Sequence, residues 1–286
     1  MLPDKLPDLL KSLSQNRNRP DGRPYVSLSF SAECQIAEQT EHSLQEIELC
    51  ALEHDIVPER YCRNQTSLSN RDQRKLLQSH VAVIGLGGLG GTVTEILARI
   101  GVGRLTLIDG DCFDESNLNR QILSSPANLG KAKADIAGQR VNDINPAVNT
   151  YPVAAFFSSE NGKGLLQGVN LVVDCLDTIS DRFVVEAICK TLSLPMVSAA
   201  IGGSSGQATV IFPCDPGLRQ VYGPPHKTPP KGIEATIGTL PFAAVYIAAV
   251  ECAEVVTILL GKSPELQNRL FLADVSDHTS ELVDLN

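Results

Sequence analysis

The chain lacks a basic excess. Its 286 residues include 24 lysines and arginines against 33 aspartates and glutamates, which gives a formal net charge of −9 at pH 7. Surfaces that bind nucleic acid or anionic membranes broadly are usually basic, so this balance disfavours both kinds of partner. It still allows a local basic pocket for phosphate groups.

Two further absences concern targeting and membranes. Residues 1–15 mix charges with leucines and show no basic start followed by an apolar run, so we expect no signal peptide. Glu251 and Glu254 interrupt the most apolar stretch, residues 239–261. Its uncharged part falls short of the roughly 18 residues that a membrane-spanning helix needs. We therefore expect a buried or subunit-interface helix there, in a cytoplasmic protein.

Paired cysteines are also lacking, since no two of the eight cysteines form a C-x-x-C pair. Several lie in apolar runs, as Cys175 does after Val172 and Val173. This usage is typical of a reduced, intracellular protein whose thiols fill core positions. It leaves no obvious four-thiolate site, and the sequence predicts no zinc.

Residues 1–58 differ in pattern from the rest of the chain. They predict a short helix near 3–13, a polar stretch through Pro24 and a second helix over 42–54. We interpret this segment as an accessory helical or partly ordered cap, and we find no chemistry in it.

From residue 59 onwards, predicted strands and helices alternate. The predicted strands are 80–84, 104–109, 148–154, 170–175 and 195–200, and the predicted helices are 69–78, 91–100, 131–144 and 180–192. This alternation indicates an α/β fold with a doubly wound, Rossmann-like, mostly parallel sheet over 59–286. A strand at 206–212, a helix at 238–260 and a hairpin of 269–275 with 281–285 would extend it with antiparallel strands. The segment of about 213–234 is rich in proline and glycine over residues 213–231 and predicts a loop.

A glycine-rich turn follows the first of these strands. Gly85, Gly87 and Gly90 satisfy G-x-G-x-x-G between a predicted strand and a predicted helix, with Gly88 among them. The first glycine allows a tight turn, the second lets the backbone approach phosphate, and the third lets the helix pack closely on the strand. Asp109 ends the next strand about 20 residues later, where a carboxylate typically binds a ribose diol. The pattern predicts an adenosine-containing nucleotide.

Polar residues beyond the turn decide which nucleotide is expected. A hydride-transfer enzyme needs to hold only a pyrophosphate, whereas Arg120 and Lys133 add cations suited to a triphosphate. Asp177 follows the strand that ends near Cys175, and Mg²⁺ favours one or two carboxylates with phosphate oxygens and water. The alternative is that the cations are ordinary surface residues and that Asp177 caps the next helix.

Five ordered motifs in this chain resemble those of the ThiF/MoeB/HesA family of adenylyltransferases, which are relatives of the ubiquitin-activating enzymes. The motifs are Arg60-Tyr61-Cys62-Arg63-Asn64, Val83 to Gly90, Leu107-Ile108-Asp109-Gly110-Asp111, Ser116-Asn117-Leu118-Asn119-Arg120-Gln121 and Asp174-Cys175-Leu176-Asp177. The resemblance runs from about residue 59 to the C-terminus and is strongest up to Gly203. Residues 1–58 lie outside it.

The resemblance implies that a homodimer uses ATP and Mg²⁺ to adenylate a small ubiquitin-like sulfur-carrier protein ending in Gly-Gly. The acceptor would be the carboxylate of the last glycine, pyrophosphate would be released, and the product would serve sulfur transfer in cofactor biosynthesis. Catalysis would rest on positioning and charge neutralisation during in-line attack on the α-phosphorus.

The resemblance also implies a set of site residues. Arg63 would reach the γ-phosphate region of the neighbouring subunit, and Arg120, Lys133 and Asp177 would complete the catalytic set, with Asp177 holding the magnesium ion. The implied nucleotide-binding residues are Gly85, Gly87, Gly88, Gly90, Asp109, Asp111, Asn117, Arg120, Lys133 and Asp177. The segment of about 213–234 would be a crossover loop that guides the substrate tail.

The chain departs from the family pattern in its cysteines. Many members carry two C-x-x-C pairs for zinc, whereas this chain has only Cys214 in that region. Many also carry a cysteine before the last large helix, where this chain reads Lys231-Gly232-Ile233-Glu234-Ala235. We therefore expect neither zinc nor a covalent thioester by that route, as in a HesA-like branch.

Three alternative functions remain at this stage. The same chemistry could act on a peptide or on a tRNA base, although the acidic net charge disfavours RNA. An NAD-dependent oxidoreductase would need a catalytic acid or base that the sequence does not reveal. A non-catalytic partner of an active subunit would be expected to have lost some of Arg63, Asn117, Arg120, Lys133 and Asp177, all of which are present.

Overall fold

A computed structural model describes residues 5–229, 232 and 234–285 of the chain. The helices are α1 (Leu6–Leu13), α2 (Phe30–Gln39), α3 (Leu44–Glu53), α4 (Asn70–Gln78), α5 (Gly88–Ile100), α6 (Lys133–Ile144), α7 (Gly162–Leu165), α8 (Ile179–Leu192), α9 (Arg219–Tyr222), α10 (Glu234–Ile237) and α11 (Pro241–Leu259). The strands are β1 (Gln15–Asn18), β2 (Pro24–Leu28), β3 (Ile56–Pro58), β4 (His80–Ile84), β5 (Arg104–Ile108), β6 (Asn149–Val153), β7 (Leu171–Asp174), β8 (Met196–Gly202), β9 (Ser205–Ile211), β10 (Arg269–Asp274) and β11 (Thr279–Asp284).

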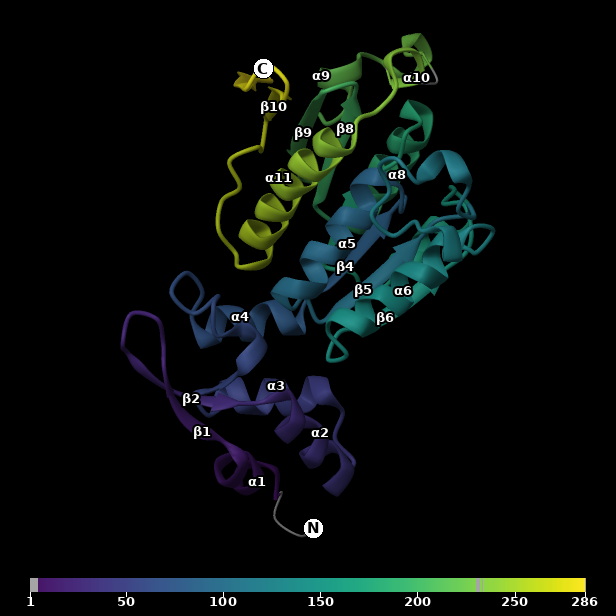
Figure 1. Ribbon diagram of the computed structural model, residues 1–286. Coiled ribbons are helices and arrows are strands. Elements are labelled where there is room, and N and C mark those ends of the chain that lie inside the picture. The colour runs from purple at the N-terminus through teal and green to yellow at the C-terminus, as the bar shows by residue number, and fades with distance from the viewer. Residues whose placement is uncertain (1–4, 230–231, 233, 286) are drawn as a thin grey trace.

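The larger part of the chain is built on one eight-stranded sheet with the order β11-β10-β9-β8-β7-β4-β5-β6. The strands from β6 to β8 pair in parallel, and β9, β10 and β11 continue the sheet in antiparallel fashion. Figure 1 shows this sheet running through the upper part of the molecule with helices against it. The predicted Rossmann-like sheet with antiparallel strands at its C-terminal end is confirmed.

Both faces of the central strands are buried, which explains why these strands are short apolar runs. In β4, Val81 and Val83 belong to a core that also contains α5, α6 and α11. The alternate residues Ala82 and Ile84 face a second core that contains α8. Because side chains alternate along a strand, one apolar run supplies two layers of helices.

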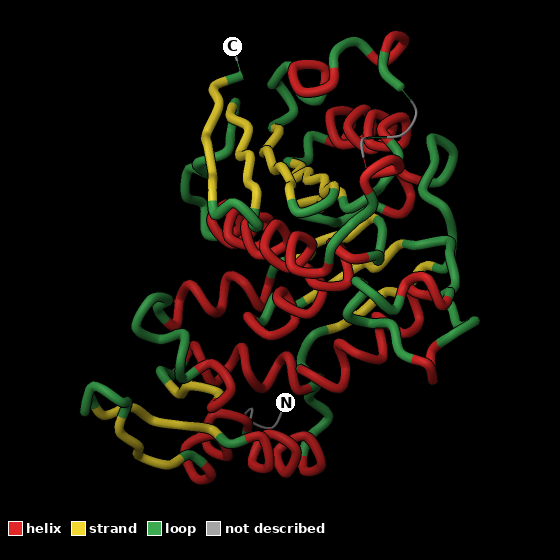
Figure 2. The backbone as a smooth tube through the Cα atoms, turned by 45° about the horizontal axis from the view of Figure 1, so that its top comes forward, coloured by secondary structure: helices red, strands yellow, loops and turns green. Residues whose placement is uncertain are grey.

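The N-terminal part of the chain is a small α/β module. Its helices α1 and α3 match the helices predicted near 3–13 and 42–54, whereas its strands correct the expectation of a purely helical or partly ordered segment. The strands β1, β2 and β3 form a three-stranded sheet, and α2 is an additional helix that the sequence did not predict. Leu10, Leu28, Ile36 and Ile47 are fully buried in a core of its own. Figures 1 and 2 both place this module beyond one end of the large sheet.

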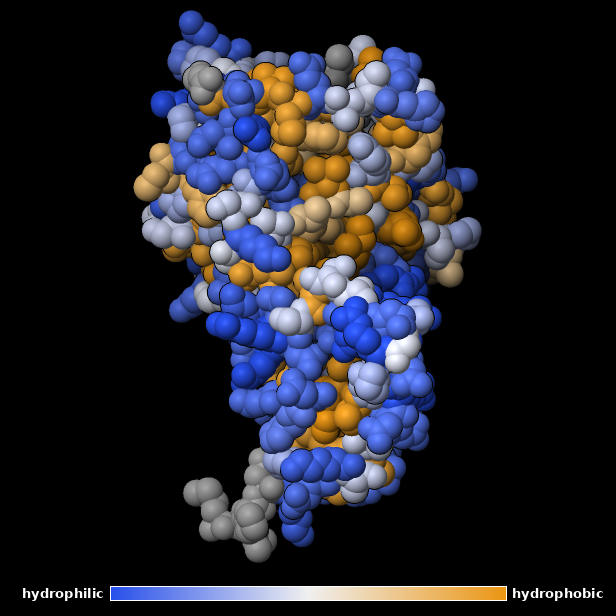
Figure 3. All heavy atoms as spheres, turned by 90° about the vertical axis from the view of Figure 1, so that its left-hand side faces the viewer, coloured by the Kyte–Doolittle hydropathy of each residue, from blue (hydrophilic) through white to orange (hydrophobic). Residues whose placement is uncertain are grey.

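The long helix α11 has the length and composition of a membrane span, with 19 residues. One face packs against α5, β8 and β9, and Glu251 and Glu254 on it are buried. The opposite face exposes Phe242, Val245 and Tyr246. Figure 3 shows a broad apolar area on the side of the molecule where α11 lies.

Candidate nucleotide site

The glycine-rich turn lies where the sheet changes direction. From β4 the chain proceeds through β5 to β6 on one side, and β7 pairs with β4 on the other. In open α/β sheets a crevice for ligands forms at the carboxyl ends of the strands at this point. Gly85 follows β4 with a φ of +85°, and a Cβ on it would lie 2.8 Å from the carbonyl oxygen of Cys175, which follows β7. Only glycine fits between the two strand ends.

Helix α5 begins inside this turn. It starts at Gly88, three residues earlier than the sequence predicted, and its first turn therefore consists of glycine and leucine. The free N–H groups of a helix start attract anions such as phosphate. A Cβ at Gly90 would lie 1.8 Å from the carbonyl oxygen of Gly85, so this glycine allows the helix to pack against the turn.

A chain of polar contacts links the end of β5 to the start of α6. The carboxylate of Asp109 accepts hydrogen bonds from the N–H groups of Leu86 and Asp111, at 2.7 Å and 2.8 Å. Burial raises the pKa of Asp109, although these bonds and Lys133 act against the increase. The Nζ atom of Lys133 lies 3.0 Å from Asp111 Oδ2 and is itself buried. The turn, the ribose-type acid and the lysine are thus connected.

The segment between β5 and α6 contributes further polar groups. Asn117 closes a capping box with Asp114, and Arg120 donates to the side chain of Asn119 at 2.9 Å. Gln121 is buried against Gly87, and its Oε1 atom has no hydrogen-bond partner among the described residues. A buried polar group of this kind indicates a ligand or water beside it.

Asp177 lies in the loop between β7 and α8. Its carboxylate is exposed and accepts a hydrogen bond from Thr178 at 3.2 Å. Below it, the guanidinium of Arg182 donates to the carbonyl oxygens of Leu176 and Ala199 and to Asp174, the last of these at 3.1 Å. Arg182 is almost fully buried, so it fixes the loop that carries Asp177 from inside the protein.

These groups surround one cleft of about 470 Å³. Of the residues that the sequence predicted to bind nucleotide, those lining the cleft are Gly85, Gly87, Gly88, Asp109, Asp111, Asn117, Arg120, Lys133 and Asp177. Gly90 is absent from the cleft wall, because it serves the packing of α5 on the turn. The cleft therefore brings together residues from four separate sequence motifs.

The cleft also contains residues that sequence reasoning missed. Phe156 follows β6, and its ring is 70% exposed and lies against Gly110, where a Cβ would come within 2.6 Å of it. Asp181 and Arg182 come from the first turn of α8. Gln121 stands in a motif that the sequence highlighted, but no spacing rule singles it out. Nothing in the sequence around Phe156 indicates a binding residue.

Arg63 lies elsewhere, at the opposite end of the sheet. The structure has it in turns before α4. It is exposed and borders a hollow of about 340 Å³ together with the hairpin of β1 and β2. Tyr61, two residues before Arg63, contacts Gly101 and Asn145, which lie just before the starts of β5 and β6. The cleft lies at the opposite ends of these strands. This chain does not bring Arg63 to its own cleft.

A second cavity of about 510 Å³ adjoins the nucleotide cleft. The two share Asp177, Arg182, Ala200 and Ile201. The walls of the second cavity are mainly apolar and come from β8, β9 and the segment of residues 221–237. Part of the predicted crossover loop therefore borders this cavity, although residues 230, 231 and 233 of the loop lie outside the described part of the chain.

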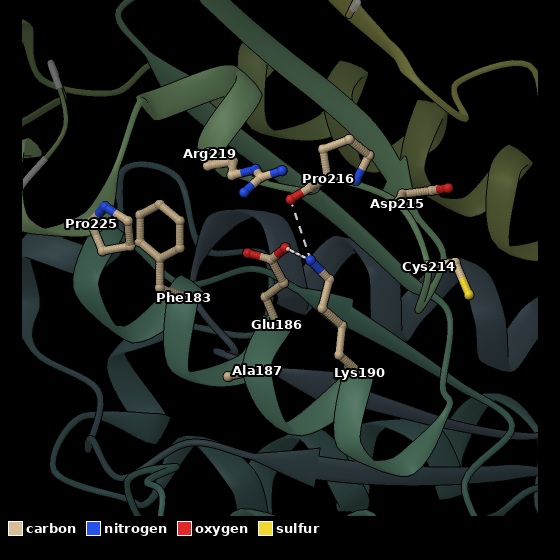
Figure 4. A pocket seen from close by; sticks show the side chains of 9 residues that line it. All are labelled: Phe183, Glu186, Ala187, Lys190, Cys214, Asp215, Pro216, Arg219 and Pro225. Atoms are coloured by element: carbon tan, nitrogen blue, oxygen red, sulfur yellow. Dashed lines mark hydrogen bonds and ion pairs between the residues drawn. The ribbon is translucent and has the colours of Figure 1, made fainter.

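A third hollow lies between α8 and the start of the segment 213–234, and charged side chains in its wall are paired with other protein groups. Figure 4 shows Glu186 and Lys190 pointing toward each other, at 2.6 Å, with Lys190 also 3.3 Å from the carbonyl oxygen of Pro216. Exposed Cys214 lies at its edge. The contacts anchor the start of the crossover segment to α8.

Among the described residues no group of three or more His, Cys, Asp or Glu side chains could hold a metal ion, and the expectation of no zinc remains a prediction.

Comparison with known proteins assigns the chain to a family. The ThiF family model matches residues 61–285, so the chain belongs to the ThiF family. It is an adenylyltransferase of this family, which sets aside the oxidoreductase alternative. It is 32% identical over 229 residues to the SAMP-activating enzyme E1 of Haloferax volcanii, covering 79% of this chain and 84% of that protein.

Two further relatives belong to sulfur-carrier and molybdopterin systems. The chain is 31% identical to the sulfur carrier protein ThiS adenylyltransferase of Escherichia coli, over 70% of this chain and 80% of the relative. It is 39% identical to the molybdopterin-synthase adenylyltransferase of Salmonella typhimurium, over 53% of this chain and 63% of the relative. It spans less than half of the adenylyltransferase and sulfurtransferase MOCS3 of Drosophila yakuba, at 45%.

Solved structures share the fold at lower identity. The crystal structure of PaaA has a TM-score of 0.66 at 22% identity and covers 80% of this chain and 82% of that one. The crystal structure of E. coli MccB with ATP has a TM-score of 0.64 at 22% identity and covers 79% and 71% of the two chains. These likenesses support the Rossmann-like architecture.

Proposed function

We propose that this protein adenylates the C-terminal carboxylate of a small ubiquitin-like sulfur-carrier protein that ends in Gly-Gly. The observation that carries the proposal is the nucleotide cleft, in which the glycine turn, Asp109, Arg120, Lys133 and Asp177 face one space that opens into a second, apolar cavity. A site for this reaction must hold a triphosphate and a protein tail next to each other. The names of the relatives support a carrier as the acceptor.

The residues of the cleft fit ATP. The unpartnered Oε1 of Gln121 and the glycine cradle at the start of α5 leave polar groups and space for phosphates. We assign the ribose diol to Asp109 and the phosphates to Asn117, Arg120 and Lys133, because the cations can neutralise a triphosphate. Lys133 is held by Asp111, so its charge is already oriented before ATP binds.

The carboxylate of Asp177 fits a magnesium ion, and Asp181 beside it offers a second oxygen donor. When bound, Mg²⁺ would neutralise phosphate charge and lower the barrier to pyrophosphate departure. One or two carboxylates suffice for Mg²⁺, because phosphate oxygens and water complete its coordination. Arg182 holds the backbone of Leu176, so that Asp177 keeps its position at the mouth of the cleft.

The reaction needs no protein nucleophile. An oxygen of the ionised carrier carboxylate attacks the α-phosphorus of ATP in line with the bond to the β-phosphate oxygen. That bond breaks, its electron pair leaves with pyrophosphate, and a mixed anhydride of the carrier with AMP forms. The protein contributes by fixing the two reactants and by placing Arg120 and Lys133 where negative charge develops.

We further propose that the active form is a homodimer. The exposed face of α11 with Phe242, Val245 and Tyr246 forms an apolar area next to the cleft, and such areas mark protein contacts. A symmetric pair could deliver the exposed Arg63 of one chain to the cleft of the other. Mixing Arg63→Ala chains with Asp177→Ala chains should then restore exchange that neither variant shows alone; mixtures as inactive as the separate variants would contradict the trans arrangement.

ATP–pyrophosphate exchange tests the proposed reaction. The expected result is exchange that depends on Mg²⁺ and on a carrier ending in Gly-Gly, and that disappears when the last glycine of the carrier is deleted. Exchange with short peptides but with no carrier would show that the acceptor is a peptide. Exchange with a tRNA would show that the acceptor is a nucleobase. Absence of exchange with every acceptor would overturn the proposal.

A further inference from the structure

The turn that carries Arg63 is held by the N-terminal module. Strand β3 leads directly into a 3₁₀ turn, Glu59–Tyr61, and Arg63 follows two residues later. The turn continues through hydrogen bonds from the N–H groups of Cys62 to Glu59 and of Asn64 to Tyr61, at 3.1 Å and 2.8 Å. The side chains of this turn determine how firmly it is held.

Glu59 is bound by the hairpin of β1 and β2. Its carboxylate accepts hydrogen bonds from Ser27 at 2.5 Å, from Tyr25 at 2.8 Å and from Arg17 at 3.2 Å. Burial alone would raise the pKa of Glu59, but these donors lower it below its usual value. The carboxylate is therefore ionised and oriented by three residues of the hairpin.

The next residue, Arg60, is bound by the helices of the module. Its guanidinium lies 3.0 Å from Glu48 of α3 and 3.5 Å from Glu33 of α2, and it lies 5.1 Å from the ring centre of Phe30. It also donates to the carbonyl oxygen of Ile144 at the end of α6. Arg60 thus joins the module to the nucleotide-binding domain.

Tyr61 completes this joint from the core. It is fully buried, donates to Glu48 at 3.0 Å and accepts from Asn145 at 2.8 Å. Its ring lies so close to Gly101 that a Cβ there would come within 2.7 Å of it. Three consecutive side chains, those of Glu59, Arg60 and Tyr61, are therefore fixed by the hairpin, the helices and the core, and the exposed Arg63 follows after one intervening residue.

We propose that the N-terminal module is a clamp that sets the position of Arg63 for the cleft of a partner subunit. Glu59 and Arg60 are positioning residues, since they act through the turn and touch neither nucleotide nor acceptor. This inference rests on the proposed function, in which Arg63 serves the neighbouring chain. Residues 5–58 lie at the end of the sheet away from their own cleft. The inference gives them the role of positioning a residue that acts in the cleft of the partner subunit.

The test uses Glu59→Ala in the full chain, with Glu265→Ala as a control that removes only an exposed ion pair to Arg269. Loosening a positioned group by about 1 Å can cost about 100-fold in rate, so Glu59→Ala should lower ATP–pyrophosphate exchange to that extent. The control should retain exchange. A Glu59→Ala protein with full activity would overturn the clamp, while an inactive wild type would instead refute the proposed function.

Mixed dimers separate positioning from general damage. A Glu59→Ala chain keeps its own Asp177, so pairing it with an Asp177→Ala chain supplies an intact Arg63 to an intact cleft and should restore exchange. Pairing Glu59→Ala with Arg63→Ala supplies no well-placed arginine to either cleft and should remain inactive. If the first pair also stays inactive while Arg63→Ala with Asp177→Ala recovers, Glu59 acts on folding in general, and the clamp is refuted.

Discussion

The guanidinium of Arg182 donates a hydrogen bond to the carbonyl oxygen of Leu176, the residue immediately before Asp177. The same guanidinium binds Asp174 at the end of β7 and Ala199 in β8. A side chain inside the protein thereby fixes the loop that presents a carboxylate to the cleft. The position of the loop depends on the buried ion pair of Arg182 with Asp174. Asp177 and Arg182 therefore give separate predictions, one for activity and one for stability.

Asp177→Asn should lower ATP–pyrophosphate exchange by at least about 100-fold, the loss typical when a preorganised electrostatic group at a reacting centre is removed. The neutral amide would bind Mg²⁺ poorly. Initial exchange rates over a range of Mg²⁺ concentrations measure the effect. Asp277→Asn, in the exposed turn of the C-terminal hairpin, is the matched control. Unchanged exchange would show that Asp177 does not bind Mg²⁺ and has only a structural role before α8.

Arg182→Met should destabilise the fold by about 3–5 kcal/mol, because it leaves the fully buried Asp174 without its cation. Urea unfolding followed by circular dichroism gives the change. Arg140→Met removes a partner of Glu95, but that carboxylate keeps Arg99, so the cost should stay below about 1 kcal/mol. Equal losses in both variants would show that burial does not govern the energy here.

Phe156→Ala should raise the KM for ATP about tenfold and leave kcat nearly unchanged. The exposed ring lies at the cleft against Gly110, where it can stack on the adenine base, and such stacking is worth about 0.5–1.5 kcal/mol. Phe156→Tyr should keep the wild-type KM. Steady-state exchange at varied ATP distinguishes the two, and an unaltered KM in the alanine variant would place the base elsewhere.

Gly90→Ala should destabilise the protein by about 1–3 kcal/mol, because the new methyl group would meet the carbonyl oxygen of Gly85 and force the turn to shift. Gly164→Ala in α7 would meet no atom within 4 Å in the part of the chain that the structure describes, and it should be neutral or slightly stabilising. Thermal unfolding of both variants provides the comparison. A Gly90→Ala protein as stable as the wild type would contradict the close packing of α5 on the turn.

Stability should fall as the pH rises from about 5 to 8. Burial raises the pKa of Glu33 to about 7 and, together with the charge of Glu33, that of Glu48 to about 8, while the single cation of Arg60 opposes both increases. A carboxyl group with a raised folded pKa favours folding at low pH and loses this effect as the pH passes its folded pKa.

Glu48→Gln provides the control for this pH dependence, because it removes one of the two carboxyl groups that titrate in this range. Urea unfolding at pH 5.5, 7 and 8.5 should therefore give a flatter profile for the variant than for the wild type. Wild-type stability that is constant or increasing over this range would contradict the prediction.

Much of the large domain could be predicted from the sequence because its signals are local. Strand β4 matches the predicted residues 80–84, and α4 matches the predicted helix 69–78, with Ser69 and Asp72 forming a capping box at its start. Strand β1 was missed because its residues Gln15–Asn18 are all exposed and show no apolar alternation. Its pairing with β2 depends on a hairpin contact that no periodicity reveals.

The candidate site shows the same division. The glycine turn, Asp109 and Lys133 belong to motifs whose spacing has a physical meaning, and the cleft brings them together. Phe156 and Arg182 reach it from separate elements, so only the folded chain shows their proximity to the glycine turn. Gly90 was predicted to serve both nucleotide binding and packing; the structure shows its packing against Gly85, and its role in binding stays a prediction.

The placement of Arg63 has a consequence for how such an enzyme responds to dilution. A catalytic centre assembled from two chains exists only while the chains are paired, and pairing follows mass action. At low concentrations the number of complete centres would then fall with the square of the chain concentration. Turnover per chain would therefore depend on the total concentration of the protein, and the amount of protein in the cell would set how active each copy is.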